Sequence, residues 1–501
     1  MRWIIAIFLL IPQLAHGAEI IIGVEYAMPG VAKTFAELGV PAFKGYPDEL
    51  PWGKMQPAKD SKIDFNFLDR LVKEYQDAGF RHATIVLKAK SPWASRDNAK
   101  NYAPKPEHWA DFEKWVKAVV ERYDHDGKDD MPGLKYPIRY YELGSEFSTF
   151  EPTPTPDYLE TLERAHRAAH AAYDRVIFMH AAFLTTSAFK DHPAPNNVDP
   201  AFAELEKRTN KRILFKSLGD IRAVLDKHKS FDAVNFRALG DAYEIEDTSS
   251  WLRWEMRQRK FEKPLIITDT MPSPLIAWGP STIPKGLPAL MGIVLPPATE
   301  NDRPRVAEFF KRLVAKDSDT LAWTHSFVAW EMVKKVVVAA EQKIELINTS
   351  FMEDLELFKG FGAGAGVSAW GGMADCKINI LSQQREIKGI RPSFYAVGQL
   401  QKHIKGYTSV TRETAEPNVR LYRFEKPNAT VWIAWVEPGL LLPGDPVPSK
   451  MLSLKSTQAV AFESLIVKQG QKTPDREQRE PKNGVVTIPV SVAPVFVIRG
   501  K

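Results

Sequence analysis

The sequence contains a single cysteine, Cys376, among its 501 residues. One cysteine excludes an intramolecular disulfide framework and any metal cluster held by several thiolates. The chain also lacks an HExxH motif, a P-loop and a strand-turn-helix G-x-S-x-G segment, and its 11 histidines show no spacing that indicates a metal site. We therefore expect neither a cofactor nor a bound metal ion.

Long apolar runs are absent after the N-terminus, so no segment reaches the roughly 20 residues that a membrane-spanning helix needs. The N-terminus itself has Arg2, an apolar run from Trp3 to Pro12, and the small residues Ala15 and Gly17. This order is typical of a secretory signal peptide cut after Gly17, whereas a membrane anchor would require a longer apolar run. We expect export to the periplasm or the medium. We expect no attached lipid, because no cysteine stands at the cut to carry one.

Neither sign of charge dominates, because a net charge of +5 is small for a chain of this length. No run of Lys and Arg interleaved with aromatic residues marks a nucleic-acid surface. The slight excess of positive charge is compatible with acidic polysaccharides, and equally with an ordinary solvated surface. A content of 44% hydrophobic and 26% charged residues is that of a globular protein rather than a disordered one.

Short apolar runs alternate with segments of helical periodicity over most of the chain, which indicates repeated βα units and a parallel sheet. Eight such units favour a closed barrel over an open doubly wound sheet, and no glycine fingerprint for a dinucleotide follows any strand. We expect an α/β fold, a (β/α)₈ TIM barrel followed by a small C-terminal β-sandwich. The strands are predicted at 20–25, 42–43, 82–87, 138–143, 176–179, 233–236, 265–268 and 344–350.

Helical periodicity ends near Gly406, which predicts three parts: a signal peptide over 1–17, a barrel over 18–405 and a β-sandwich over 406–501. Helices of the barrel are predicted, for example, at 65–78, 158–173 and 392–403. Strands of the last part are predicted at 419–424, 430–436, 459–462, 485–489 and 493–498.

A proline-rich segment from Thr270 to the helix near Arg305 is far longer than most loops. It leaves the C-terminal end of the seventh strand, where TIM barrels hold their active sites. We expect it to form a wall or a lid.

Two carboxylates follow predicted strands at that same end of the barrel. Glu146 comes after the fourth strand, and Asp269 comes after the seventh. Cleavage of a glycosidic bond requires two carboxylates that face one bond, one to donate a proton and one to attack the sugar or activate water. The pair therefore indicates glycoside hydrolysis, although Asp269 stands before Thr270 and Pro272 and is also suited to capping a turn.

Three further segments carry a family resemblance: Trp52 to Pro57, Ser91 to Ala94, and Ser393 to Gly406. In this order the chain resembles the retaining glycoside hydrolases of clan A, and it is similar to family 39 and relatives with a C-terminal β-domain. The resemblance implies that Glu146 is the general acid/base and Asp269 the nucleophile. It also implies an oligo- or polysaccharide substrate and no cofactor.

The chain departs from the family pattern at three places. Ser145 stands where the family usually has Asn, Asp269 where it usually has Glu, and Arg237 lies beside the strand-six position that often carries His or Tyr. A nucleophile shorter by one methylene leaves room for water, which favours inversion or weakens catalysis. The alternative function is therefore a catalytically inactive, carbohydrate-binding descendant of the same fold.

Several other residues are candidates for contact with a sugar. Trp93 offers a flat apolar face on which a sugar ring stacks, and Arg237 is suited to holding a sugar carboxylate unless it forms a surface salt bridge. The remaining substrate-binding candidates are Ser145, Trp52, Tyr26 and Glu25, of which the aromatic ones are also ordinary core residues. Weaker candidates are Glu345, Asp354 and Trp370, and nothing near Lys88 or Lys90 supports a Schiff base.

Overall fold

The structure is a computed structural model of the 501-residue chain. The predicted signal peptide and nearly all of the proline-rich segment lie outside the residues that it describes. The described residues are 19–46, 50–148, 151–185, 188–189, 191–208, 216–272, 300–354, 359, 366–379 and 384–500.

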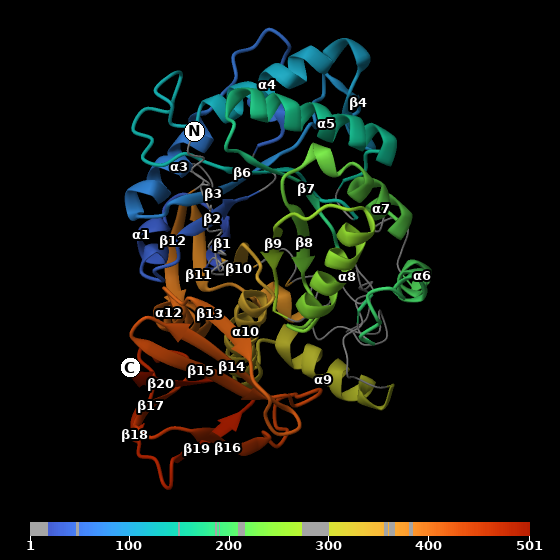
Figure 1. The fold of residues 1–501 in the computed structure, drawn as a ribbon. Coiled ribbons are helices and arrows are strands. Elements are labelled where there is room, and N and C mark those ends of the chain that lie inside the picture. Colours follow the sequence, from blue (N-terminus) through green and yellow to red (C-terminus); the bar gives the residue numbers. More distant parts are fainter. Residues whose placement is uncertain are drawn as a thin grey trace, which may run out of the picture.

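Eight parallel strands form one sheet in the order β7-β6-β3-β2-β1-β10-β9-β8. Isolated parallel bridges from Met179 to Ala233 and from Phe183 to Phe236 join β7 to β8 and close the sheet into a barrel (Figure 1). The predicted fold class and all eight predicted strands are thereby confirmed. The strands are β1 (Ile21–Ala27), β2 (Ala42–Gly45), β3 (His82–Leu87), β6 (Tyr140–Glu146), β7 (Ile177–Ala182), β8 (Val234–Ala238), β9 (Leu265–Thr270) and β10 (Leu346–Phe351).

Helices pack around the outside of this sheet (Figure 1). In α3 the buried residues Leu68, Leu71, Val72 and Tyr75 recur at helical spacing, and the helix ends at Gly79 in the left-handed conformation. The helices are α1 (Ala32–Ala36), α2 (Trp52–Met55), α3 (Asn66–Ala78), α4 (Trp109–Glu121), α5 (Thr155–Ala172), α6 (Asp199–Arg208), α7 (Leu218–Asp226), α8 (Glu244–Gln258), α9 (Arg303–Val314), α10 (Ser318–Glu341) and α12 (Pro392–Ile404). Within the described ranges, none of them has both the length and the apolar character needed to cross a membrane.

The C-terminal region is all β, as predicted, and lies below the barrel in Figure 1. A six-stranded sheet in the order β13-β14-β15-β20-β17-β18 packs its apolar side against the β16–β19 pair, with Trp432, Leu454 and Ile488 in the shared core. The last barrel helix ends at Ile404, and β13 begins at Ser409. The strands are β13 (Ser409–Arg412), β14 (Val419–Lys426), β15 (Ala429–Val436), β16 (Ser449–Lys455), β17 (Val460–Ser464), β18 (Arg476–Arg479), β19 (Val485–Ser491) and β20 (Val495–Gly500).

Two hairpins were not predicted from the sequence. The first, β4 (Ser95–Asp97) with β5 (Asn101–Pro104), lies in the connection that follows β3. The second, β11 (Ala374–Asn379) with β12 (Gln384–Ile390), precedes α12, and the backbone of Arg385 in β12 bonds to Pro29 just after β1. Both hairpins are rich in polar residues, so they lack the apolar alternation that reveals a half-buried strand.

The interior of the barrel is divided into an apolar and a polar half. Near the N-terminal ends of the strands, inward side chains such as Tyr140, Ile266 and Leu346 form an apolar cluster. Because strand side chains alternate with a period of two, the next inward residues include Lys44 and Glu142, which are fully buried. The charged groups are thus enclosed toward the C-terminal ends of the strands.

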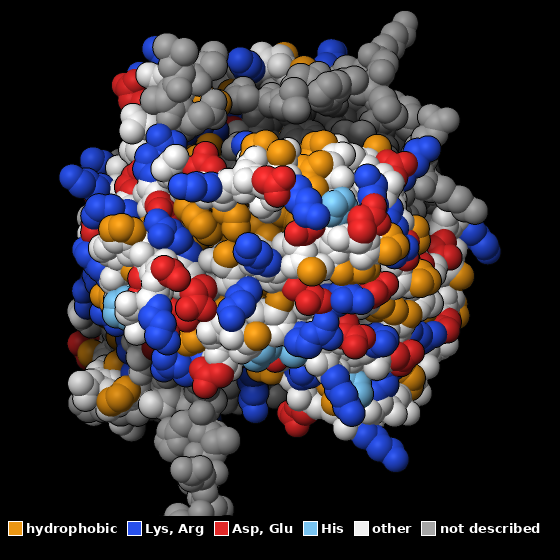
Figure 2. All heavy atoms as spheres, turned by 90° about the horizontal axis from the view of Figure 1, so that it is seen from above, with side chains coloured by type: hydrophobic (Ala, Val, Ile, Leu, Met, Phe, Trp, Pro, Cys, Tyr) orange, Lys and Arg blue, Asp and Glu red, His pale blue; other side chains and the backbone are white. Residues whose placement is uncertain are grey.

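The outer surface carries mixed charge. Figure 2, which looks down from above the view of Figure 1, shows basic and acidic side chains interspersed over this face rather than separated by sign. This face therefore has no basic stripe of the kind that binds nucleic acid.

Gly23 provides a test of the packing inside the barrel. A Cβ at this position would lie 2.1 Å from Asn348 Oδ1 and 3.0 Å from the Cβ of Ala42. Since overpacking a core costs about 1–3 kcal/mol, Gly23→Ala should lower the urea midpoint of unfolding correspondingly. Gly389→Ala is the matched control, because its Cβ would meet nothing within 4 Å. Equal midpoints for the two variants would contradict the close approach at Gly23.

Candidate functional site

Arg237, at the end of β8, lies at the centre of the site. Its guanidinium is fully buried among four carboxylates. Nη1 is 3.0 Å from Asp269 Oδ2 and 3.8 Å from Glu25 Oε1, Nη2 is 3.7 Å from Glu142 Oε1, and Nε is 3.7 Å from Glu146 Oε1. The carboxylates come from β1, β6 and β9, so one side chain links three other strands of the barrel.

Neutral oxygens complete the surroundings of this guanidinium. Nη2 donates to the carbonyl and to the hydroxyl of Ser145, at 2.5 and 3.0 Å, and Nη1 donates to Thr268 Oγ1 at 3.3 Å. Thr268 Oγ1 in turn donates to Asn235 Oδ1 at 3.0 Å. Because a guanidinium has a fixed, planar set of donors, these bonds fix its orientation as well as its position.

Lys44, on β2, is a second buried cation beside the first. Its ammonium is 3.1 Å from Glu25 Oε1 and 3.5 Å from Glu142 Oε2, and it donates to the carbonyl of Thr268 at 3.1 Å. Two cations thus face four carboxylates, none of which is more than 5% exposed. Unbalanced buried charge is costly, so at least one carboxyl group is expected to carry a proton.

Glu25 is the group that carries this proton. Burial raises the pKa of its carboxyl well above the usual value, and the nearby charge of Asp269 and a hydrogen bond to Asp269 raise it further, against the opposing effect of Lys44 and Arg237. A neutral Glu25 carboxyl donates to the Asp269 carboxylate.

The structure brings the two predicted catalytic residues together. Both residues were predicted to follow their strands. Instead, Glu146 is the last residue of β6 and Asp269 is the second-to-last residue of β9, and they are 5% and 3% exposed. Both contact the same guanidinium, so their carboxyls are no farther apart than the roughly 9.5 Å that inverting glycosidases reach. Residues 149–150, shortly after Glu146, and residues 273–299, shortly after Asp269, lie outside the described residues.

Tyr26 adjoins the same group of charges. It follows Glu25 at a bulge in β1 and has a positive φ of 56°, a conformation that costs a non-glycine residue about 1–3 kcal/mol. Its ring packs edge-on against Phe351, 4.4 Å away between centroids. Burial, followed by the charges of Asp269 and Glu25, raises the pKa of its hydroxyl well above the usual value, so this group remains a proton donor at neutral pH.

The tryptophan predictions have different outcomes. Trp52 was predicted to contact substrate, but it is fully buried, its Nε1 donates to Gln56 Oε1 at 2.9 Å, and its ring packs against Trp115 and Phe112. This prediction is corrected: Trp52 is a core residue because α4 covers it. Trp93 is partly exposed and edge-on to Trp52, and its role in stacking on a sugar stays a prediction.

The weaker candidates lie in other surroundings. Glu345 accepts from the hydroxyl of Tyr140 at 2.9 Å, at the N-terminal end of β10 and thus at the opposite end of the barrel. Asp354 is buried and bound by Arg391, and Trp370 is also buried. Arg237 forms no surface salt bridge, because it is 1% exposed, and its Nη1 and Nη2 donate to Ser145 and Thr268. Its role in holding a sugar carboxylate stays a prediction.

Lys44 and Glu142 were not predicted to belong to the site. Glu142 is four residues before Glu146 on one strand. The period of two would have placed both carboxylates on the inward face. The prediction instead ended this strand at 143, which separated them.

Comparisons with known proteins bear on the fold. No sequence-family profile matches the chain, and no curated protein sequence matches it. Among solved structures, a glucosidase from Croceicoccus marinus superposes with a TM-score of 0.54 at 12% identity, covering 96% of this chain and 97% of that one. The fold is shared. A GH39 β-xylosidase from Caulobacter crescentus (TM-score 0.52, 12% identity, 96% of each chain) and a GH30 endoxylanase from Clostridium papyrosolvens (0.51, 10%, 97% of each) show the same likeness over the barrel and the β-domain.

The protonation of Glu25 has a measurable consequence. A carboxyl whose pKa is raised on folding contributes stability that is present below its unfolded pKa of 4.5 and is lost as pH rises through the folded pKa. Glu25→Gln keeps a neutral side chain at every pH. Relative to wild type, this variant should therefore gain stability by up to about 1.4 kcal/mol per pH unit above that value, as measured by urea unfolding from pH 4 to 9.

The control for this series is Glu107→Gln, which changes an exposed carboxylate. Its pH profile should run parallel to that of wild type. A parallel profile for Glu25→Gln as well would mean that Glu25 is ionised in the folded protein.

Proposed function

We propose that the chain is a glycoside hydrolase that cleaves O-glycosidic bonds with Glu146 as general acid/base and Asp269 as nucleophile. The observation that carries the proposal is the meeting of these two carboxylates, from β6 and β9, around one buried guanidinium at the C-terminal end of the barrel. TIM barrels hold their active sites at this end. The likeness in fold to a glucosidase, a β-xylosidase and an endoxylanase supports the same class of reaction.

In the proposed reaction Glu146 protonates the leaving glycosidic oxygen while a carboxylate oxygen of Asp269 bonds to the anomeric carbon. The aglycone leaves with that proton. Water then attacks the same carbon, gives a proton to Glu146 and releases Asp269 as a carboxylate. Arg237 contacts both groups, so its role is to fix their relative position.

A second function, sugar binding without catalysis, is favoured by the same guanidinium. The transition state of glycoside hydrolysis has oxocarbenium character and so develops positive charge. Arg237 and Lys44 are two buried cations close to the place where that charge would form. Catalysis therefore requires that the negative charge of the surrounding carboxylates exceeds the positive charge of these two side chains.

Substitution of each carboxylate separates these two functions. Purified wild type should hydrolyse at least one member of a panel of aryl glycosides and of plant, algal and bacterial polysaccharides. Glu146→Gln and Asp269→Asn should each lose about 10²-fold or more in kcat/KM, because proton donation and covalent attack are contributions of at least that size. The substrate for the comparison is the glycoside that wild type cleaves fastest.

Glu345→Gln is the matched control, since this carboxylate lies at the opposite end of the barrel and should leave activity unchanged. Full activity in Asp269→Asn would contradict the nucleophile assignment. The first-formed anomer, followed by proton NMR, should show retention, whereas inversion would make Asp269 a general base. Binding of an oligosaccharide by a wild type that cleaves none of the panel would support the second function.

We also propose that the protein is exported and that residues 1–17 are removed. The basis is the order of charged, apolar and small residues at the N-terminus. The intact mass of protein recovered from the periplasm or medium of a bacterial host should correspond to a chain that begins at Ala18. A full-length chain retained in the membrane fraction would indicate an anchor instead.

A further inference from the structure

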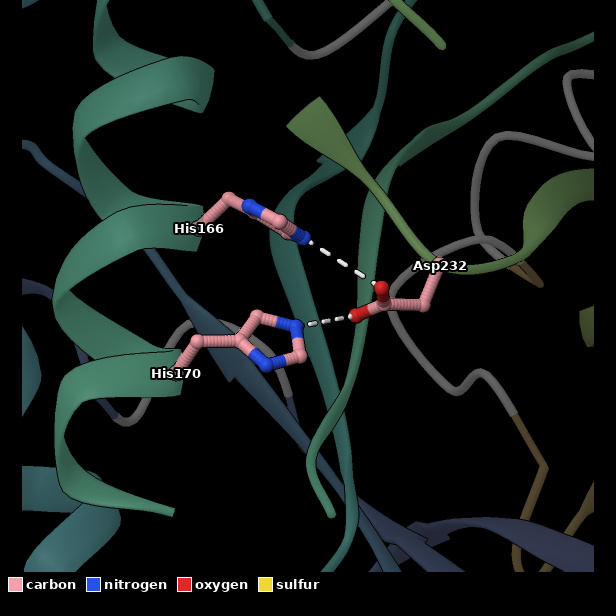
Figure 3. A group of neighbouring side chains, drawn as sticks. All are labelled: His166, His170 and Asp232. Carbon is pink, nitrogen blue, oxygen red and sulfur yellow. Dashed lines mark hydrogen bonds and ion pairs between the residues drawn. The ribbon is translucent and has the colours of Figure 1, made fainter. Parts of the chain in front are cut away.

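Two histidines and an aspartate converge on the outer side of the barrel. His166 and His170 are four residues apart on α5, so they share one face of the helix. Asp232 comes from the segment directly before β8, and both imidazoles point toward its carboxylate (Figure 3). The three ligand atoms all lie within 4.8 Å of one another.

The distances lie within about half an ångström of the edge of a tetrahedral metal site. His166 Nε2 is 3.3 Å from Asp232 Oδ1, and His170 Nε2 is 2.9 Å from Asp232 Oδ2. Zinc binds nitrogen and carboxylate oxygen at roughly 2.0–2.2 Å, which puts ligands of a tetrahedron about 3.3–3.5 Å apart. An ion between the three groups thus requires only a small movement of the side chains.

The Asp232 carboxylate is also held in place by the backbone. The Phe178 N–H donates to Asp232 Oδ2 at 2.8 Å and so fixes the carboxylate from behind. Such bonds to the ligand side chain are a regular part of metal sites.

The three side chains are also accessible. Their exposed fractions are 20% for His166, 31% for His170 and 27% for Asp232, so an ion can enter from solvent and keep water as its fourth ligand. Two imidazoles and one carboxylate form a donor set that suits Zn²⁺ and its transition-metal neighbours better than Mg²⁺ or Ca²⁺.

We propose that His166, His170 and Asp232 bind one divalent transition-metal ion, with Zn²⁺ as the representative ion. Each histidine coordinates through Nε2 and keeps its ring proton on Nδ1. The site joins α5 to the start of β8, at the end of the barrel opposite to Glu146 and Asp269, and its effect is on stability. Asp232 is 62 residues from His170, so no local spacing in the sequence predicts this site.

The position of the site in the barrel gives it a structural consequence. Between β7 and β8 the sheet is closed by isolated bridges, and beside them the Asp232 N–H donates to the Phe178 carbonyl at 2.7 Å. A metal ion held by Asp232 and by α5 therefore holds this helix to the start of β8, beside the junction of β7 and β8. Metal that binds only the folded state raises stability as its concentration increases.

The test is titration of tag-free, metal-free protein with Zn²⁺ alone, followed by calorimetry and by the thermal midpoint. Wild type should bind one ion at this site, and its Tm should rise with Zn²⁺ concentration. His166→Ala and Asp232→Asn should bind at least about tenfold more weakly, since even partners of a metal ligand change affinity by 10–100-fold. Co²⁺ in place of Zn²⁺ should give visible absorption bands that these variants lack.

His192→Ala is the matched control, because His192 Nδ1 pairs with Asp247 at 2.7 Å without a second histidine. It should bind Zn²⁺ as wild type does. Absence of binding by wild type, or unchanged affinity in both site variants, would overturn the proposal. Should either variant unfold, His170→Gln provides the same comparison, with folding checked by the Tm of the metal-free protein.

Discussion

The guanidinium of Arg237, enclosed by four carboxylates, is the constraint on which the upper half of the barrel depends. A buried cation is tolerated only where charge and hydrogen bonds compensate it. Glu25, Glu142, Glu146 and Asp269 supply the charge. The excess negative charge of these four groups is reduced by Lys44 and by the proton on Glu25. The polar layer is therefore a single electrostatic unit, in which removal of one member changes the charge state of the others.

This unit also determines what chemistry the barrel can perform. An oxocarbenium-like transition state develops positive charge, and Arg237 and Lys44 already place two cations beside the carboxylates that would stabilise it. In the proposed reaction Arg237 would hold Glu146 and Asp269 in place, yet it would also compete with a substrate for the same oxygens. The balance between positioning and competition is what separates the two proposed functions.

Periodicity in the sequence was sufficient to predict the fold, but it did not predict which charged side chains line the interior of the barrel. Apolar runs revealed all eight barrel strands, whereas the β11–β12 hairpin, with polar residues on both faces, gave no such signal. The predicted fourth strand stopped before Gly144, because glycine usually ends a strand. Here Gly144 adopts a φ of 82° at an irregularity, and the strand continues to Glu146. Lys44 and Trp52 illustrate a further limit, since burial depends on neighbours distant in sequence.

The two ends of β8 carry two different groups of charged side chains. TIM barrels place chemistry at the C-terminal ends of their strands and stability at the other end. Arg237 lies at the end of β8, and Asp232 lies just before the same strand. Each of them is tied to the neighbouring chain by its own backbone bond, since the Asp232 N–H donates to the Phe178 carbonyl at 2.7 Å and the Arg237 N–H donates to the Phe183 carbonyl at 2.9 Å. The two groups of charged side chains are therefore positioned separately, at opposite ends of one strand.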